Sequence, residues 1–471
     1  MQLKKLAFNI LSIVKKQSLL SVCFFLIFLF FLYTRLTNLQ YRIPFSWDQI
    51  QFSEQIWGIV RNHDFVLLGP RVNNDLGFYL APYFTYVLIP FYFLTNLHPN
   101  ALIVFVILMH FTIIVGITYA FTRLWSAKHA IIVLALWLIN YHTQLNDISP
   151  WWPIMIPIGT IITLLMIKII YENPDRNFNW ILFGLLQGFF FHMHFQYILM
   201  IGFTLIAIFL IKRRKKCTWR GSGLFLITFI ITFIPLILFD FRHNFLNFKL
   251  FIDFFFGSGS SDKNYLSFIP VLNNFFHPYT IVKSTLLSSL ILILTILGGF
   301  YLFKNSKGFK QIIYFSAVLT IVFMLILFSA YGKRPSEYYF LFSLPLFLMI
   351  VAELTLQFKL SSILVMVIVF MAIINYPTYQ NNIRINPQSL FFMDKTVLYL
   401  EKNIGKTGYR LSFSDDNIAS GFSYLFRQKG FKLETDTKSH SFVHISIPPD
   451  KKLTTKIIGN YGVYISKNLV R

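Results

Sequence analysis

Two acidic side chains are the first candidates for chemistry in this largely apolar chain. Asp48 lies in the stretch PFSWDQ and is followed by apolar residues at helical spacing, and Asp147 lies shortly before the stretch PWWP. Two carboxylates on one face of a protein can divide the work, with one acting as a general base and the other positioning a substrate or holding a metal ion. Each also has a structural alternative, because Asp48 could cap a short helix and Asp147 could mark a solvated helix end.

One arginine near the first acid has suitable chemistry for a phosphate. Arg71 follows a Gly-Pro pair, and a guanidinium beside such a turn can take a phosphate through two parallel hydrogen bonds. The next stretch is rich in tyrosine and includes Tyr79 and Tyr83. Tyr and Trp side chains also gather at membrane interfaces, so an aromatic belt is the alternative interpretation of these residues. Trp151 has the same ambiguity, because Trp faces stack on sugar rings.

The elements that must position these residues are membrane helices. The 471 residues are 56% hydrophobic and 13% charged, and the mean hydropathy is +0.61. An ordinary soluble domain is about 45–50% apolar and about 25% charged. The composition therefore excludes a soluble enzyme, a disordered chain and a collagen-like chain. The two cysteines, Cys23 and Cys217, cannot build a disulfide framework, and no zinc-binding spacing occurs in the sequence.

Eleven apolar runs approach the roughly 20 residues that a membrane helix needs. They lie near 17–34, 102–122, 129–145, 153–171, 180–195, 196–211, 223–239, 283–303, 311–330, 340–357 and 360–376. The first run follows four lysines and is expected to be an uncleaved anchor with a cytoplasmic N-terminus. These runs predict an α-helical polytopic membrane protein.

A further run, residues 78–97, contains Pro82 and Pro90 and could either span the membrane or lie at its interface. If it does not span, the basic loops at 123–128, 212–220 and 304–310 all fall in the cytoplasm, as the positive-inside bias requires. The eleven-span topology also places the C-terminus outside the cytoplasm, in a multi-pass protein of the plasma membrane.

The same topology explains the formal net charge of +23. A basic chain with a pI near 9.8 could suggest a nucleic-acid partner. The largest basic cluster, residues 212–216, directly follows an apolar run, which is typical of a topology signal and not of a phosphate-binding groove. No nucleic-acid partner is expected, and the lipid bilayer is the main surrounding of the chain.

Three segments outside the predicted membrane helices are longer than simple connections. They are residues 35–101, residues 240–282 and the tail from 377 to 471. The tail changes abruptly to a soluble composition, with helical patterns near 389–403 and 417–429 and strand-like patterns at 409–414 and 441–447. We therefore expect a transmembrane domain over 1–376 and a small extracytoplasmic α/β domain over 377–471.

The order of these features resembles the GT-C membrane glycosyltransferases, in particular the protein mannosyltransferase and aminoarabinose transferase group (glycosyltransferase family 39-like). The features are a basic N-terminus, one helix, an outer loop with Asp48, a Gly-Pro and Tyr-rich stretch, a basic loop with Arg-Leu-Trp at 123–125, and Asp147. The resemblance is clearest over residues 40–160. It implies a GT-C-like fold whose transmembrane domain is catalytic, and transfer of a hexose or pentose from a polyprenyl phosphate donor at the extracytoplasmic face.

The resemblance also implies roles for the two acids. Asp48 matches the acid of the family's first outer loop and would act as the base for the incoming hydroxyl or amine, although Gln49 stands where many relatives carry Glu. Asp147 matches the acid after the third helix and would position the acceptor or hold a metal. A single displacement of this kind inverts the anomeric centre. No cofactor is predicted, but a divalent metal ion is compatible with the acids, and a lipid, a glycan or a protein could be the acceptor.

Departure of a lipid phosphate needs cations that receive its charge. The candidates are Arg71, Arg242, Lys333 and Arg334. The Lys333–Arg334 pair lies in a short outer loop, where the positive-inside bias disfavours basic residues, so a specific role would explain it. An ion pair with Glu337 or contact with anionic lipid are the alternatives.

The remaining candidates would contact the sugar or the acceptor. They are Trp47, Tyr79, Tyr83, Trp151, His194, Gln196, Glu337 and Tyr338. His192 and His194 lie two positions apart, and such residues on a helix point in different directions, so they are poor joint metal ligands. A hydrogen bond from His194 or Gln196 to a sugar is the chemistry that we expect instead.

Two other classes of protein would share a lipid-linked substrate. A transporter or flippase would place polar residues near the membrane midplane and often shows repeated halves, whereas here the acids lie at outer helix ends and no repeat is detected. An O-antigen polymerase or ligase would use the same face and a lipid donor but would not predict the Asp48 loop followed by the Tyr-rich stretch. A lipid-phosphate-sugar glycosyltransferase is therefore the leading hypothesis.

Overall fold

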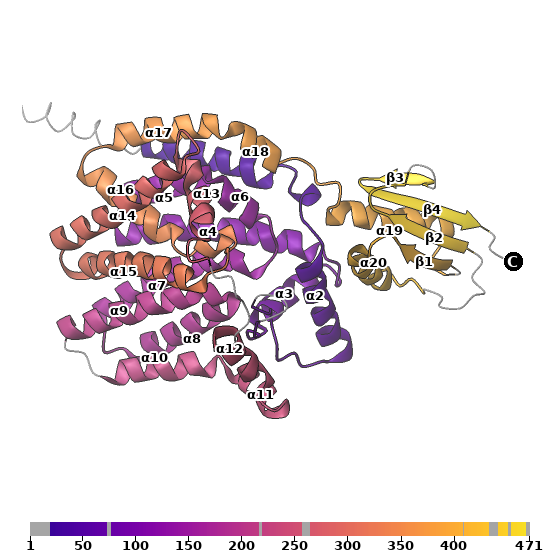
Figure 1. The fold of residues 1–471 in the computed structure, drawn as a ribbon, viewed down its shortest axis with the longest axis horizontal. Helices are drawn as coiled ribbons and strands as arrows, with labels where there is room; N and C mark the ends of the chain where they lie inside the picture. The colour runs from indigo at the N-terminus through magenta and orange to yellow at the C-terminus, as the bar shows by residue number, and fades with distance from the viewer. Residues whose placement is uncertain are drawn as a thin grey trace, which may run out of the picture.

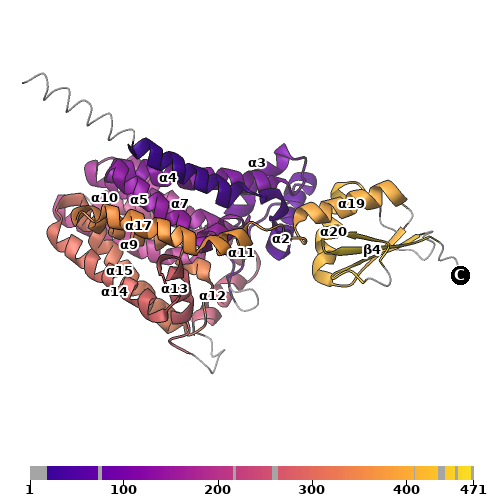
Figure 2. The same ribbon diagram turned by 90° about the horizontal axis from the view of Figure 1, so that it is seen from above.

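The computed structural model describes residues 19–72, 77–215, 219–256, 264–407, 409–432, 441–450 and 454–467. Within these residues the chain forms a large body of helices and a small C-terminal sheet with its own helices (Figure 1). The sheet lies at one end of the helical body in both views (Figures 1 and 2). The expected class, a mostly helical chain with apolar helices and a small C-terminal α/β unit, is confirmed in this outline.

The helical body begins with a long apolar helix, Leu19–Tyr41, which changes to π-helical geometry at η1, Leu32–Leu36, and ends in the 3-10 turn η2, Leu39–Tyr41. The helices that follow are α2 (Trp47–Trp57), α3 (Tyr83–Leu94), α4 (Ala101–Leu124), α5 (Ala127–Ile139), α6 (Tyr141–Asp147), α7 (Ile156–Glu172), α8 (Asn177–Met193), α9 (Ile198–Lys215), α10 (Trp219–Ile231), α11 (Ile234–Arg242), α12 (Leu246–Phe256), α13 (Ile269–Phe276), α14 (Thr285–Asn305), α15 (Gly308–Tyr331), α16 (Leu344–Gln357), α17 (Ser361–Ile374) and α18 (Tyr376–Asn382). Short helical turns connect some of them: η3 (Gly58–Asn62), η4 (Trp152–Met155), η5 (Phe195–Tyr197), η6 (His277–Tyr279) and η7 (Glu337–Phe340).

The described helices account for the predicted apolar runs, but they do not confirm the count of eleven spans. Six helices are long and apolar enough to cross a membrane, or up to eight if each of two bent pairs is one span. The runs predicted after residue 100 nevertheless fall on helices, although 129–145 is divided between α5 and α6, and 223–239 between α10 and α11. Run 78–97 forms α3, whose 12 residues extend only about 18 Å, less than the roughly 30 Å of a hydrocarbon core.

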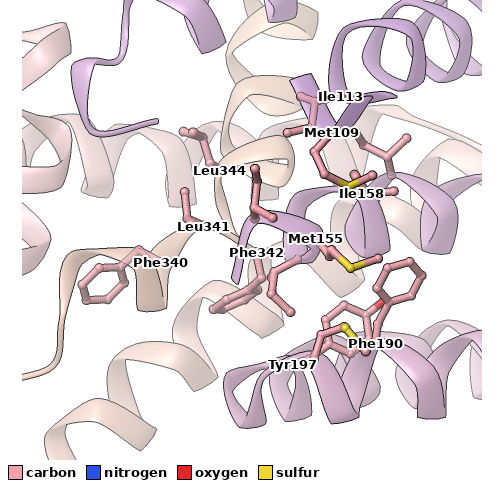
Figure 3. Packing of buried hydrophobic residues seen from close by; sticks show 14 of the residues in the cluster. Met109, Ile113, Met155, Ile158, Phe190, Tyr197, Phe340, Leu341, Phe342 and Leu344 are labelled. Carbon is pink, nitrogen blue, oxygen red and sulfur yellow. The ribbon is translucent and has the colours of Figure 1, made fainter. Parts of the chain in front are cut away.

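The centre of the helical body is a close packing of aliphatic, aromatic and methionine side chains. Figure 3 shows side chains of α4, of η4 and α7, and of α8 and η5 gathered beside residues 340–344. Because lipid is as apolar as these side chains, close packing and internal hydrogen bonds hold such helices together. One such bond runs from the Gln187 amide to the Thr163 hydroxyl at 2.7 Å, and the Thr163 and Tyr197 hydroxyls lie 2.8 Å apart.

The C-terminal unit, which we define as residues 383–467, combines two helices with a four-stranded sheet. Its elements are α19 (Leu390–Ile404), β1 (Tyr409–Phe413), α20 (Asp416–Gln428), β2 (Ser441–Ser446), β3 (Lys456–Ile458) and β4 (Tyr461–Lys467). The strand order is β1-β2-β4-β3, with β1 and β2 parallel and the other pairs antiparallel. Both helices and the first two strands coincide with the predicted patterns, whereas the β3–β4 hairpin was not predicted.

Candidate functional site

A cavity of about 620 Å³ opens at the end of the helical body that carries the C-terminal unit. Five segments that are far apart in the sequence line it: the residues just after the first helix, the end of α6 with the α6–η4 connection, one residue of α13, the loop that leads into η7, and the start of the C-terminal unit. The lining residues are Arg42, Pro44, Leu145, Asn146, Ile148, Ser149, Trp151, Val271, Arg334, Pro335, Ser336, Glu337, Tyr338 and Asn386.

Arg42 gives this cavity a buried positive charge. It follows η2 directly, is only 3% exposed, and donates from Nη1 to the Thr37 carbonyl oxygen at 2.8 Å. Its Nε and Nη2 atoms are buried and have no hydrogen-bond partner in the part of the chain that the structure describes. Burial and the nearby positive charge of Arg35 lower the pKa of Arg42 to about 10. A buried guanidinium with free donors in a cavity wall is a site for an anion, because an unpaired buried charge is costly.

Two further donors lie in the same wall. The Trp151 Nε1 atom is buried without a hydrogen-bond partner among the described residues, and the Trp151 ring contacts Tyr338 with 4.5 Å between ring centroids. Arg334 is exposed and also lines the cavity. The cavity therefore brings together two arginines and an indole N–H, a set of donors that suits an anionic group such as a phosphate.

Glu337 faces this positive wall but is already paired. Its Oε2 atom lies 2.8 Å from His142 Nδ1, and the Asn274 side-chain amide donates to its Oε1 atom. The hydrogen bond from His142 is the main reason why the pKa of Glu337 is lowered, against the opposing effect of burial. Glu337 is thus ionised and fixed by α6 and α13, and among the described residues its ion pair is made with His142 and not with Lys333 or Arg334.

Asp48 lies in the first turn of α2, next to this cavity. The helix is capped by Ser46 and Gln49 in a reciprocal capping box, so Asp48 is not the N-cap that one alternative predicted. The Oε1 atom of the Gln49 side chain accepts from the Ser46 backbone N–H at 3.2 Å, so Gln49 has a structural function at this position. Burial raises the pKa of Asp48, and the charge of Asp48 adds to the raised pKa of Tyr338, whose main cause is burial. Asp48 is therefore a half-buried acid close to a residue of the cavity wall.

Asp147 has a different surrounding from Asp48. Its Oδ2 atom accepts from Arg35 Nε at 3.1 Å, and the two side chains are 6% and 1% exposed. Burial raises the pKa of Asp147 to about 6, and the Arg35 guanidinium opposes this rise. Asp147 belongs to a buried ion pair, although its neighbours Asn146 and Ile148 line the cavity. The described residues contain no group of three or more His, Cys, Asp or Glu side chains that could hold a metal ion.

Three of the predicted phosphate cations do not line the cavity. Arg71 donates from Nε to the Gly77 carbonyl oxygen at 2.7 Å and stacks over Tyr79 at 5.4 Å, where residues 69–72 pair with residues 78–80. Arg242 is exposed at the end of α11, and Lys333 is half-buried beside Arg334. The structure therefore brings only Arg334 of the four predicted cations to the cavity wall.

The remaining predicted residues surround the cavity at different distances. Trp151 and Tyr338 line it, and the Gln196 side-chain amide donates to the Tyr338 carbonyl oxygen at 3.1 Å. The His194 ring contacts the Tyr338 ring at 5.5 Å, so His194 and Gln196 support the wall from behind. The Tyr83 hydroxyl donates to the Thr232 carbonyl oxygen at 2.7 Å, and Trp47 is 73% exposed.

Sequence reasoning missed Arg42, Arg35 and His142. In the predicted topology, the two arginines lie at the outer end of the first apolar run, where the positive-inside bias disfavours basic residues. The positive-inside bias singles out Arg42 for the same reason as Lys333 and Arg334. His142 carried no comparable signal, because only the fold brings it to Glu337.

The chain is similar over nearly its whole length to crystal structures of ArnT, an aminoarabinose transferase, from Cupriavidus metallidurans. With the structure bound to undecaprenyl phosphate the TM-score is 0.58 at 11% identity, covering 95% of this chain and 98% of that one. With the apo structure the TM-score is 0.57 at 12% identity, covering 96% and 98%.

No protein-family model and no curated protein sequence matches the chain. The likeness to ArnT therefore concerns the fold, and at this level the expected resemblance to the aminoarabinose transferase group is confirmed.

Proposed function

We propose that this protein is an integral membrane glycosyltransferase that moves a sugar from a polyprenyl phosphate donor to an acceptor. The observation that carries the proposal is Arg42, a buried guanidinium with two unpartnered donor atoms in the wall of the cavity. An ArnT structure of the same fold was solved bound to undecaprenyl phosphate, which supports a lipid phosphate as the anion.

The proposed reaction is a single displacement at the anomeric carbon. Asp48 takes the proton from the acceptor hydroxyl or amine, and the freed lone pair forms the new bond to the anomeric carbon. The bond from that carbon to the phosphate oxygen breaks, and the phosphate leaves with the bonding electrons. Because the acceptor attacks from the opposite face, the configuration of the anomeric carbon is inverted. Arg42, Arg334 and the Trp151 N–H stabilise the charge that develops on the departing phosphate.

Asp147 has a positioning role in this scheme. Its ion pair with Arg35 joins α6 to the first helix, directly before the segment that carries Arg42. The carboxylate thereby neutralises one of two neighbouring guanidinium groups and leaves the other for the substrate. We therefore place Asp147 behind the site rather than in contact with the acceptor.

We further propose that the cavity faces the extracytoplasmic side of the plasma membrane. In this orientation the N-terminus is cytoplasmic, and the C-terminal unit, expected as a soluble domain over 377–471, is extracytoplasmic. The distribution of basic loops supports this orientation, because the loops at 123–128, 212–220 and 304–310 then all lie in the cytoplasm.

The function is tested by supplying radiolabelled polyprenyl phosphate sugars to membranes that contain the wild type or Asp48→Asn. Transfer of label to an acceptor is expected for the wild type, and the loss of a general base should reduce it by at least about 100-fold in the variant. Asp253→Asn, which changes an exposed acid of α12, is the matched control and should transfer at the wild-type rate. Absence of transfer by the wild type from any donor, or equal transfer by Asp48→Asn, would overturn the proposal.

A further inference from the structure

The segment from residue 42 to residue 57 carries both Arg42 and Asp48 and follows the first long helix, Leu19–Tyr41. On one side, α2 packs on the helical body, where the Phe52 ring contacts Phe84 at 4.9 Å and Trp152 at 5.4 Å. The Ser53 hydroxyl also lies 2.6 Å from the Tyr92 hydroxyl of α3. An 11-residue helix is marginal by itself, so its other contacts decide how firmly Asp48 is placed.

The backbone on both sides of Arg42 is hydrogen-bonded to the C-terminal unit. The Asn386 N–H donates to the Tyr41 carbonyl oxygen at 2.9 Å, and the Leu390 N–H donates to the Ile43 carbonyl oxygen at 3.0 Å. Asn386 also lines the cavity. The C-terminal unit thus contributes to the cavity wall and determines the path of the chain through Arg42.

Tyr424 of α20 connects this segment to the helical body. Its ring is fully buried and lies 5.9 Å from the Phe45 ring and 6.0 Å from the Trp57 ring, between centroids. Its hydroxyl donates to the Leu97 carbonyl oxygen at 2.7 Å, just before α4 begins. One side chain of the C-terminal unit therefore contacts Phe45, just before α2, and Trp57, the last residue of α2, as well as the body of the protein.

Arg427, one turn later on α20, holds the last turns of α2. Its guanidinium forms an ion pair with Glu54 and stacks over the Trp57 ring at 4.7 Å. The two charged side chains are 44% and 41% exposed, so charge attraction alone contributes little. The combination of a planar stack and an ion pair nevertheless restricts the orientation of α2.

We propose that the C-terminal unit is a positioning element of the active site, in which Tyr424 and Arg427 hold α2 so that Asp48 remains at the edge of the cavity. This inference rests on the proposed function, because it concerns the residue that acts as the base. The unit is then a working part of the transferase and not a separate soluble module. Asp48 is the catalytic residue, and Tyr424 and Arg427 are positioning residues that act through α2.

The experiment compares three variants with the wild type in lipid nanodiscs. Arg427→Met keeps an unbranched apolar stem but removes the ion pair and the stack. The double variant Glu54→Arg with Arg427→Glu exchanges the charges. Lys168→Met is the matched control, because Lys168 of α7 also combines an ion pair, with Glu172 at 3.0 Å, and a cation–π contact, with Phe309 at 5.0 Å.

Two quantities are measured on each protein. The first is kcat for sugar transfer, and the second is the rate of amide hydrogen exchange in α2, compared with the rates in α4 and α7. For Arg427→Met we expect kcat to fall about tenfold, because small misplacement of a catalytic group is costly, and exchange to accelerate in α2 alone. The double variant keeps an ion pair but loses the stack over Trp57, so it should recover only a small part of the loss, and Lys168→Met should behave as wild type. If Arg427→Met does not fold, Tyr424→Phe, which removes only the hydrogen bond to Leu97, should lower kcat about threefold with the same local exchange.

Several results would overturn the inference. Unchanged kcat or unchanged exchange in α2 would show that Arg427 does not position this helix. Faster exchange throughout the helical body would show a general loss of stability instead. If the wild type transfers no sugar from any donor, the proposed function fails and the catalytic part of the inference fails with it. The exchange measurement still shows separately whether the C-terminal unit holds α2.

Discussion

Arg35 and Arg42 are seven residues apart on one segment, both are buried, and they have opposite surroundings. All three donor groups of Arg35 are used, by Asp147 at 3.1 Å, by the Thr34 hydroxyl at 3.0 Å and by the Thr143 hydroxyl at 2.8 Å. Arg42 has one bond to a backbone oxygen, and its Nε and Nη2 atoms have no partner in the described part of the chain. The donors of the first arginine are all used by the protein, whereas the second keeps two donor atoms for which we propose an anion as the partner.

The two acids of the site repeat this contrast. Asp147 is the partner of Arg35, whereas the side chain of Asp48 makes no hydrogen bond or ion pair within the residues that the structure describes. Buried charges usually have partners, because an unpaired one costs several kcal/mol. The paired charges hold α6 to the first helix, and the proposed function assigns the substrate to the charges that lack partners among the described residues.

The largest expected effect on stability comes from breaking the buried ion pair between Arg35 and Asp147. Arg35→Met leaves Asp147 as an uncompensated buried acid, and we expect the free energy of unfolding to fall by about 3 kcal/mol or more. Thermal unfolding of the purified variant measures this change. Arg35→Met combined with Asp147→Leu, which removes both charges, should regain most of the stability. A single variant as stable as wild type would show that the pair does not hold α6 to the first helix.

The pH dependence of sugar transfer tests whether Asp48, the acid without a partner among the described residues, is the base. Burial disfavours the ionised form of Asp48 and raises its pKa, so the base becomes protonated at a higher pH than an ordinary Asp. Transfer should therefore decrease as the pH falls through this raised pKa, by about tenfold for each pH unit below it. The measurement is kcat/KM between about pH 4 and pH 8. An acid limb that persists in the residual activity of Asp48→Asn would assign the titration to another group.

A smaller effect is expected at the opposite end of the helical body, where the members of a half-buried charged cluster are paired with one another. Glu353 of α16 contacts His129 Nε2 at 2.9 Å and Lys310 Nζ at 3.3 Å. Glu353→Gln should lower the free energy of unfolding by about 1–2 kcal/mol and leave sugar transfer within about twofold of wild type. Glu172→Gln, in the exposed pair with Lys168, is the control and should change stability by less than about 0.5 kcal/mol. Loss of transfer in Glu353→Gln would contradict the division between structural and substrate-binding charges.

Hydropathy predicted the long helices well, because a membrane helix needs a long apolar run and little else. Helices α4 and α15, with 24 residues each, lie within a few residues of their predicted positions. The run 223–239 was predicted as one span, but the chain bends by 48° between α10 and α11 at Pro235. Proline in that run was the available signal for the bend. The short β3 strand, of three residues, has no periodicity that a sequence could show.

The site was predicted less completely than the fold, for a physical reason. Sequence order identified Asp48, Trp151, Arg334 and Tyr338, which all lie in or beside the cavity. It could not distinguish Asp48 from Asp147, because the difference depends on a partner 112 residues away. It also selected Arg71 instead of Arg42, although the Arg71 guanidinium donates a hydrogen bond to the Gly77 carbonyl oxygen. Whether a charge is paired is decided by tertiary contacts, and these have no local signature.

We propose that the Arg42 Nε and Nη2 atoms, which have no partner among the described residues, bind the donor phosphate, and this central claim has one direct test. Thermal unfolding of Arg42→Met is measured with and without undecaprenyl phosphate, and Arg242→Met, which removes an exposed arginine, is the matched control. We predict that Arg42→Met without lipid phosphate is at least as stable as wild type, and that it loses the stabilisation that undecaprenyl phosphate gives to wild type and to the control. Full stabilisation of Arg42→Met by undecaprenyl phosphate, or a loss of stability as large as that of Arg35→Met, would contradict the claim.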